Sequence, residues 1–315
     1  MTPDELLESV RHLPNQVRDV AIAAADTDGL PRVEGITEVI ILGIGAGRVA
    51  GDVIAAICEL RGSIPIIATG GRCPSWVTAS TLAIALSDGG DNTAPIEAVE
   101  EARSAGARLI AVAAPGTFAQ ACVDWEIPVV PIDPDAGPAA GLGVSIVPVL
   151  VLLERLRFAK GMSGAISNTA SQLSDRVAQL GETDAIDNLA VALDDRLAIV
   201  TGAGAVGKHA ARRWVQELDR VGEVAAVRRR LPTGPADVAS GVRLAESASN
   251  GAALILLRHD FEPRGLDAGV ALLPGHFNNI HSFSAAGDGP LAQILDLVLL
   301  ADAVVAAVLR RRSAE

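Results

Sequence analysis

The stretch Glu38–Gly47, with the sequence EVIILGIGAG, decides the fold class of this chain. Its first half, Glu38–Leu42, is a short β-prone run, and its second half carries three glycines. A helical pattern follows over residues 48–60. An apolar run that passes through glycines into a helix predicts a buried strand, a tight turn and a helix start.

The same alternation extends over the rest of the first half. An amphipathic helix is predicted at residues 4–26, and another at 95–105, whose first-turn proline needs no amide donor. Further strands are expected at 64–68, 81–86, 108–113 and 128–131, followed by a long helix at 144–160. Continuous apolar strands separated by helices predict a parallel sheet that is covered on both faces.

The second half repeats this order after a break at 161–165 and two helices that end near residue 193. Strands are expected at 197–201, 223–227, 252–257 and 270–273, and helices at 205–218 and 291–311. We therefore predict an α/β protein of two tandem Rossmann-like domains, each a parallel sheet flanked by helices. The predicted organisation is an N-terminal helix and linker (1–35), a first domain (36–160), a helical linker (161–185) and a second domain (186–315).

Composition narrows the class of protein and its partners. Hydrophobic residues make up 50% of the chain and charged residues 20%, which supports a large core. The net charge of -12 argues against nucleic acid and anionic membranes as partners. The acidic N-terminus does not resemble a signal peptide. Cys58, Cys73 and Cys122 form neither a zinc motif nor an evident disulfide framework, so we expect a cytoplasmic protein without a metal.

A second glycine-rich turn, Thr201–His209, allows three interpretations. Gly202, Gly204 and Gly207 fit the dinucleotide pattern G-x-G-x-x-G, but the next strand ends in Arg228-Arg229-Arg230 and not in the ribose-binding acid. Those arginines suit a 2′-phosphate. The turn also approaches a P-loop, except that His209 replaces the magnesium-binding hydroxyl. A nucleotide-binding oxidoreductase and a tight turn without ligand both remain open.

A third loop, Leu86–Thr93 (LSDGGDNT), joins a buried strand to a helix. Ser87 and Thr93 supply hydroxyl groups, and the glycines allow the backbone to approach a ligand. Hydroxyls together with helix N-terminal amides can hold a phosphate without lysine. The simpler interpretation is that Asp91, Asn92 or Thr93 caps the following helix.

These motifs, taken in order, resemble the bifunctional phosphoglucose/phosphomannose isomerases of the sugar isomerase (SIS) superfamily. Gly43–Asp52 takes the place of the family's G-x-G-G-S-A-x-x-G-D turn, and Pro74–Val77 that of its P-x-W-V segment. Ser87–Thr93 corresponds to its phosphate loop, and Arg213–Gln216 is similar to its R-W-K-x-Q segment. The resemblance extends from about residue 38 to about residue 305.

The resemblance implies two SIS domains, a homodimer, and an active site between the domains and across the dimer. The implied activity is interconversion of glucose 6-phosphate or mannose 6-phosphate with fructose 6-phosphate, without cofactor or metal. The implied ligand is a sugar phosphate or a related anionic metabolite. Its expected binding residues are Gly45, Gly47, Arg48, Ser87, Gly89, Gly90, Asn92 and Thr93.

The departures from the family pattern fall on its chemistry. Val238 stands in place of the base glutamate, and alanine in place of the catalytic arginine after Pro138. Glu262 replaces the ring-opening histidine, and the family's C-terminal lysine has no counterpart. The pattern does not identify the catalytic residues. Asp237, Glu262 and His259 are the candidates that could replace the family's acid and base.

Two functions therefore compete with the nucleotide hypothesis. One is a divergent isomerase with a relocated acid and base. The alternative is a catalytically inactive SIS protein that binds a sugar phosphate or a partner in a regulatory role. Asp88 and Asp91 also bring negative charge to the loop that would hold a phosphate, and Arg48 is the residue expected to offset it.

Overall fold

The computed structural model describes residues 2–59, 61–87, 93–133, 137–181, 184–229, 243, 246, 251–271, 273–275 and 277–314. The chain divides into two compact units. The N-terminal unit is His12–Ala170, and the C-terminal unit is Ser171–Glu315 together with Met1–Arg11. Helices α1 (Pro3–Asp26) and α6 (Met162–Gln179) each contribute residues to both units.

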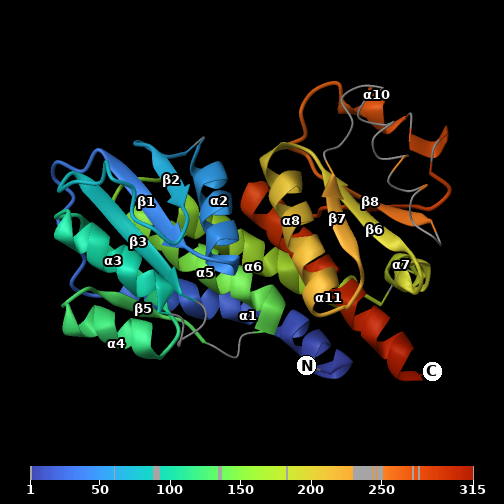
Figure 1. The fold of residues 1–315 in the computed structure, drawn as a ribbon, viewed down its shortest axis with the longest axis horizontal. Helices are drawn as coiled ribbons and strands as arrows, with labels where there is room; N and C mark the ends of the chain where they lie inside the picture. Colours follow the sequence, from blue (N-terminus) through green and yellow to red (C-terminus); the bar gives the residue numbers. More distant parts are fainter. Residues whose placement is uncertain are drawn as a thin grey trace. The chain divides into compact units, whose positions relative to one another are not determined.

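The N-terminal unit is built on a five-stranded parallel sheet in the order β2-β1-β3-β4-β5 (Figure 1). The strands are β1 (Glu38–Gly43), β2 (Ile66–Thr69), β3 (Thr81–Ser87), β4 (Arg108–Ala113) and β5 (Val129–Pro131). All seven residues of β3 are buried, while β2 and β5 at the two edges are partly exposed. The predicted parallel arrangement is confirmed. Continuous apolar strands are typical of parallel sheets, since both faces of such a sheet are covered.

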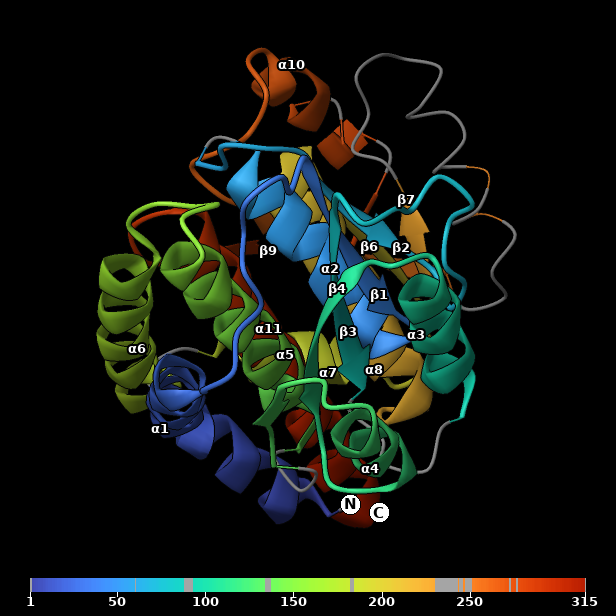
Figure 2. The same ribbon diagram turned by 90° about the vertical axis from the view of Figure 1, so that its left-hand side faces the viewer.

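Helices cover both faces of this sheet. α2 (Ala46–Cys58) packs on β1, β2 and α5 (Gly137–Arg155), whereas α3 (Ala94–Ser104) and α4 (Thr117–Asp124) pack together on the other face (Figure 2). The sequence did not predict α4. Helix α5 begins seven residues before the expected start. Pro138 is compatible with this early start, since it falls in the first turn, where no amide donor is required.

The C-terminal unit holds a four-stranded parallel sheet in the order β7-β6-β8-β9 (Figure 1). Its strands are β6 (Leu197–Gly202), β7 (Ala226–Arg229), β8 (Ala252–Arg258) and β9 (Ile280–Ser284). The strand predicted at 270–273 is wrong: helix α10 (Leu266–Val270) and a 3₁₀ turn (Leu273–Gly275) occupy this region. Leu266, Leu273 and Phe277 pack into the core beside the sheet, and an apolar run of this length does not distinguish a strand from a buried helix.

Helices α7 (Ala185–Leu193), α8 (Gly204–Arg220) and α11 (Pro290–Ala314) also belong to this unit. α8 packs on β6, β7 and α11. The indole Nε1 of Trp214 donates to the Leu297 carbonyl at 2.7 Å, which ties α8 to α11. Helix α11 is long and apolar enough to cross a membrane, but its most apolar window is entirely buried inside the protein. A core helix has the same properties.

Candidate functional site

The carboxyl ends of β1 and β3 lie side by side in the N-terminal unit. Gly43 at the end of β1 pairs with Leu86 on β3, one residue before Ser87. β2 lies on one side of β1 and β3 on the other, so the order in which successive strands are added across the sheet reverses between β1 and β3. In open α/β sheets, ligands bind in the crevice at such a switch point. The fold therefore brings the first glycine turn and Ser87 to one edge of the sheet.

The glycines of the β1–α2 turn meet two different demands. A Cβ on Gly43 would lie 2.6 Å from the backbone carbon of Gly47, so only glycine allows the strand and helix to approach this closely. Gly45 has a φ of 58°, which favours glycine, and it is the N-cap of α2. No side chain caps this helix. The helix start therefore keeps amide groups that no side chain caps, which is the feature that anion sites at helix N-termini use.

Arg48, on the first turn of α2, is engaged by a neighbouring acid. Its Nε lies 3.1 Å from Oδ1 of Asp52, and its guanidinium passes near Gly70. We expected Arg48 to offset Asp88 or Asp91, which lie outside the described residues. Asp52 already neutralises part of its charge, so the amides of α2 provide the more available positive potential at this turn.

Ser87 and Thr93 flank the loop that the sequence assigned to phosphate. Ser87 ends β3, is only 4% exposed, and accepts the Ala114 amide at 3.0 Å through its carbonyl. Thr93 is exposed and occupies the N-cap position of α3, but its hydroxyl makes no capping hydrogen bond. Capping by Thr93 is therefore not observed. Gly89, Gly90 and Asn92 lie outside the described residues.

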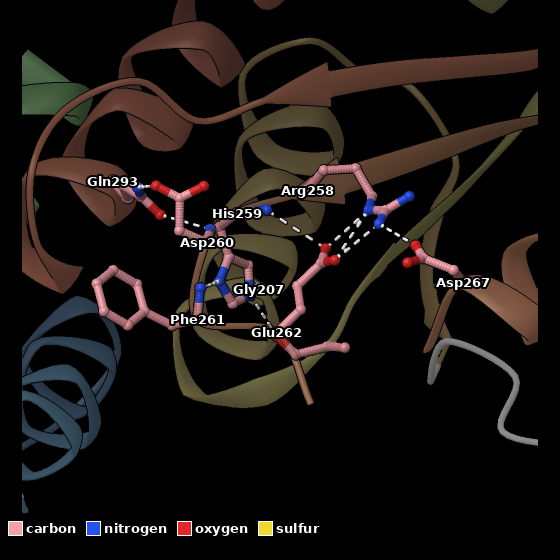
Figure 3. Close-up of polar contacts among 9 residues, drawn as sticks. Gly207, Arg258, His259, Asp260, Phe261, Glu262, Asp267 and Gln293 are labelled. Atoms are coloured by element: carbon pink, nitrogen blue, oxygen red, sulfur yellow. Dashed lines mark hydrogen bonds and ion pairs between the residues drawn. The ribbon is translucent and has the colours of Figure 1, made fainter. Parts of the chain in front are cut away.

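His259, a predicted catalytic candidate, is held by backbone groups in the C-terminal unit (Figure 3). It is 7% exposed, its Nδ1 accepts the Phe261 amide at 3.1 Å, and its Nε2 lies 2.7 Å from the Ala203 carbonyl oxygen. Because Nδ1 accepts, the ring proton is assigned to Nε2, which donates to that carbonyl. The Gly207 amide, 3.1 Å from both Nε2 and the same oxygen, then donates to the oxygen. Both ring nitrogens therefore serve the local structure.

Glu262, a second candidate, forms a bidentate ion pair with Arg258 (Figure 3). The three nitrogen–oxygen distances are 2.8, 3.1 and 2.8 Å, and the outer guanidinium nitrogen also bonds Asp267 at 2.8 Å. Hydrogen bonding to Glu262 is the main reason that the pKa of Arg258 is raised. Both carboxylate oxygens of Glu262 are therefore occupied by the Arg258 guanidinium.

The third candidate, Asp237, and its neighbour Val238 lie outside the described residues. The segment that lacks the family's arginine leads into α5. A cavity of about 560 Å³ in the N-terminal unit is lined by residues from the end of α2 and the start of β2, and none of the predicted binding residues lines it. Within the described ranges, no cluster of His, Cys, Asp or Glu could hold a metal ion.

Sequence reasoning missed Arg258, which positions Glu262. It also missed the bond between Gln293 and Asp260 (Figure 3), in which the Gln293 amide donates to the carboxylate at 2.5 Å. The only local signal was the spacing of Arg258 and Glu262, four residues apart, which is typical of an ion pair on a helix but here spans a turn after a strand.

Comparison with known proteins is consistent with this architecture. Residues 182–310 match the family model described as the bacterial phospho-glucose isomerase C-terminal SIS domain. A bifunctional phosphoglucose/phosphomannose isomerase of Caldicellulosiruptor bescii is 27% identical over 215 residues. This match covers 66% of the chain and 63% of the relative, so the chain spans less than two thirds of that relative's length.

Solved structures share the fold over nearly the whole chain. A candidate phosphosugar isomerase from Clostridium difficile 630 has a TM-score of 0.75 at 13% identity and covers 99% of this chain, with 93% of its own length matched. The C-terminal domain of glucosamine-fructose-6-phosphate aminotransferase from Francisella tularensis has a TM-score of 0.67 at 14% identity, with 98% of each chain covered. Tagatose-6-phosphate ketose/aldose isomerase from Escherichia coli has a TM-score of 0.61 at 13% identity, with 98% and 93% covered.

Proposed function

We propose that the chain is a divergent member of the sugar isomerase (SIS) superfamily, related to the bifunctional phosphoglucose/phosphomannose isomerases, and that it binds a sugar phosphate in its N-terminal unit. The observation that carries this proposal is the meeting of an uncapped helix start with Ser87 at the β1–β3 switch point. The proposed activity is the family's aldose–ketose interconversion, between glucose 6-phosphate or mannose 6-phosphate and fructose 6-phosphate.

The proposed binding residues divide by the group that each would offer. The β1–α2 turn would offer backbone amides and the Arg48 guanidinium, and Ser87 and Thr93 would offer hydroxyls. The glycines would let a phosphate oxygen approach the main chain. The proposed set is Gly45, Gly47, Arg48, Ser87, Gly89, Gly90, Asn92 and Thr93.

The proposed reaction moves a proton between C1 and C2 of the open-chain sugar. It requires an acid to open the ring, a base to accept the C2 proton of the aldose, and positive charge to stabilise the enediolate. The base would return the proton to C1 as the C2 hydroxyl becomes the ketone. Of the three candidates, Asp237 lies outside the described residues, whereas Glu262 and His259 would first have to release their partners.

A second candidate function is binding of the sugar phosphate without turnover, in a regulatory role. The contacts of His259 and Glu262 favour it, because each group is committed to structural bonds. Under either function, we propose a homodimer in the cytoplasm. Size-exclusion chromatography with light scattering would test the dimer.

The decisive experiment separates binding from turnover. Calorimetric titration with fructose 6-phosphate measures binding, and a coupled assay with glucose 6-phosphate or mannose 6-phosphate measures isomerisation. Ser87→Ala should weaken binding by at least tenfold, whereas Ser80→Ala, one residue before the amino end of β3, should leave it unchanged. Binding with turnover supports the isomerase, and binding without turnover supports the regulator. Absence of binding at millimolar ligand would refute both.

A further inference from the structure

A second cavity lies wholly within the C-terminal unit, at the carboxyl edge of its sheet. Its volume is about 540 Å³, which is within the range of small-molecule sites. Three segments meet there: the β6–α8 turn at Gly202–Gly204, the end of β7, and the loop Pro263–Leu266 after β8. As in the N-terminal unit, this edge is a switch point, because β7 and β8 lie on opposite sides of β6.

The lining of this cavity is cationic. It includes Lys208, Arg228, Arg229 and Arg264, and no acidic residue of the described chain lines it. Arg228 donates to the Lys208 carbonyl at 3.4 Å, which holds the end of β7 against the first turns of α8. Among the described residues, no carboxylate forms an ion pair with Lys208, Arg229 or Arg264. Four positive side chains converge here in a chain of net charge -12.

The acids nearest in sequence do not neutralise this cluster. Glu262 and Asp267 flank the loop that carries Arg264, and both are bonded to Arg258. Arg258 does not line the cavity. Because Glu262 and Asp267 are paired with Arg258, the positive potential of the lysine and arginines that line the cavity is available to an anionic ligand.

The start of α8 adds backbone donors to the same cavity. Ala203 is its N-cap, and no side chain caps the helix. A Cβ on Gly202 would lie 2.5 Å from the Gly207 oxygen, and Gly204 has a φ of 62°. These glycines place the helix start close against β6, and Gly204 lets the backbone face the cavity. An uncapped helix start in a cationic cavity favours a phosphate or diphosphate group.

The position of Arg228 and Arg229 narrows the class of ligand. The segment β6–α8–β7 is a βαβ unit with G-x-G-x-x-G at its first turn, so the glycine pattern has the structural context that a dinucleotide site requires. In such sites the end of the next strand, about 20 residues after the last glycine, contacts the ribose, through an acid for a 2′-hydroxyl or an arginine for a 2′-phosphate. Here both residues at that strand end are arginines.

We propose that this cavity binds a 2′-phosphorylated dinucleotide of the NADP(H) class. The diphosphate lies at the start of α8 beside Lys208, and Arg228 and Arg229 hold the 2′-phosphate. Arg264 closes over the bound phosphates from the loop after β8. The site is separate from the proposed sugar phosphate site, which belongs to the other unit, and the proposal concerns binding only.

The P-loop interpretation of the same turn fits less well. A P-loop needs a hydroxyl after its lysine to hold magnesium. His209 stands at that position, is 6% exposed, and is absent from the residues that line the cavity. Without an acid or a hydroxyl among its described lining residues, the cavity favours direct contact between cationic side chains and phosphate.

Calorimetric titration of the full chain with NADPH and with NADH tests the proposal. We expect NADPH to bind at least tenfold more tightly than NADH. Arg228→Ser/Arg229→Ser should abolish this preference while NADH affinity stays the same, and Lys208→Ala should weaken both ligands. The matched control Arg11→Ser/Arg72→Ser removes two exposed arginines outside the cavity and should keep the preference.

Several results would overturn the proposal: no NADPH binding at millimolar concentration, equal affinity for NADH, a preference that survives the double substitution, or equally tight binding of inorganic pyrophosphate. Thermal unfolding of each variant checks that it is folded. Fructose 6-phosphate binding is titrated in parallel on wild type and on Ser87→Ala. Because the two sites use different residues, absence of fructose 6-phosphate binding to the wild type with retained NADPH binding would refute only the proposed function, and absence of NADPH binding with retained fructose 6-phosphate binding would refute only the nucleotide site.

Discussion

The Nε2 of His259 lies 2.7 Å from the carbonyl oxygen of Ala203, the residue that precedes α8. The same ring accepts the Phe261 amide through Nδ1 at 3.1 Å. One side chain therefore joins the loop after β8 to the N-terminal turn of α8. Both segments line the cationic cavity, so the geometry of that cavity depends on the His259 side chain.

Replacement of His259 should destabilise the protein. In His259→Leu, the partly buried Phe261 amide loses its acceptor and the Ala203 carbonyl loses its imidazole partner, which together cost about 1 to 3 kcal/mol of unfolding free energy. Urea denaturation followed by circular dichroism measures this loss. His12→Leu removes an exposed histidine and should change stability by less than about 0.5 kcal/mol. Equal stability of the two variants would mean that the His259 contacts contribute nothing.

Addition of a methyl group to Gly202 should be poorly tolerated. The Cβ of Gly202→Ala would lie 2.5 Å from the Gly207 backbone oxygen, and the resulting shift of α8 should cost about 1 to 3 kcal/mol. The control, Gly164→Ala in α6, meets no atom within 4 Å and should be neutral or stabilising by up to about 1 kcal/mol. Thermal unfolding of the pair measures the difference. A Gly202→Ala protein as stable as the control would show that the helix start can shift freely.

The buried ion pair within α8 should be sensitive to loss of one partner. Arg213 and Glu217 lie 2.9 Å apart, and both side chains are at most 5% exposed. Burial is the main cause that raises the pKa of Glu217, while Arg213 opposes the rise. Glu217→Leu would leave the guanidinium without this partner and should cost about 3 to 5 kcal/mol. The double variant Arg213→Met/Glu217→Leu should recover most of that loss, and a double variant no more stable than the single one would contradict the idea.

His281 on β9 should make stability fall in mildly acidic solution. Burial lowers its pKa in the folded protein below the ordinary value of 6.5. The unfolded chain therefore takes up the proton first as the pH falls through 6.5, and the stability present above that pH is lost toward the lower folded pKa. One such group contributes at most about 1.4 kcal/mol per pH unit. His281→Gln should reduce the loss of stability between pH 7.5 and pH 5.5, as measured by urea denaturation; identical pH profiles would exclude the effect.

The sequence predicted most of the sheet because its strand signals are local. β1, β3, β4 and β6 are continuous apolar runs, and their predicted ranges agree with the structure to within about one residue. The failure at 270–273 has a physical cause. A short apolar segment buries the same side chains as a strand or as a helix, and here the choice depended on how Leu266 and Leu273 pack beside the sheet.

The candidate site was predicted less completely. Gly43 pairs with Leu86, the residue before Ser87, because parallel strands bring their carboxyl ends together. The engagement of Arg48 with Asp52 and of Glu262 with Arg258 was not predicted, since residue type alone does not say which of several acids an arginine will meet.

By itself, the sequence determined most of the strands and helices and the glycine turns that follow β1 and β6. These depend on neighbours within a few positions along the chain. Only the tertiary structure decided that His259 binds Ala203, and that Lys208, Arg228 and Arg264 face one cavity. Such contacts join segments tens of residues apart, so they arise only when the register of the sheet places the strand ends side by side.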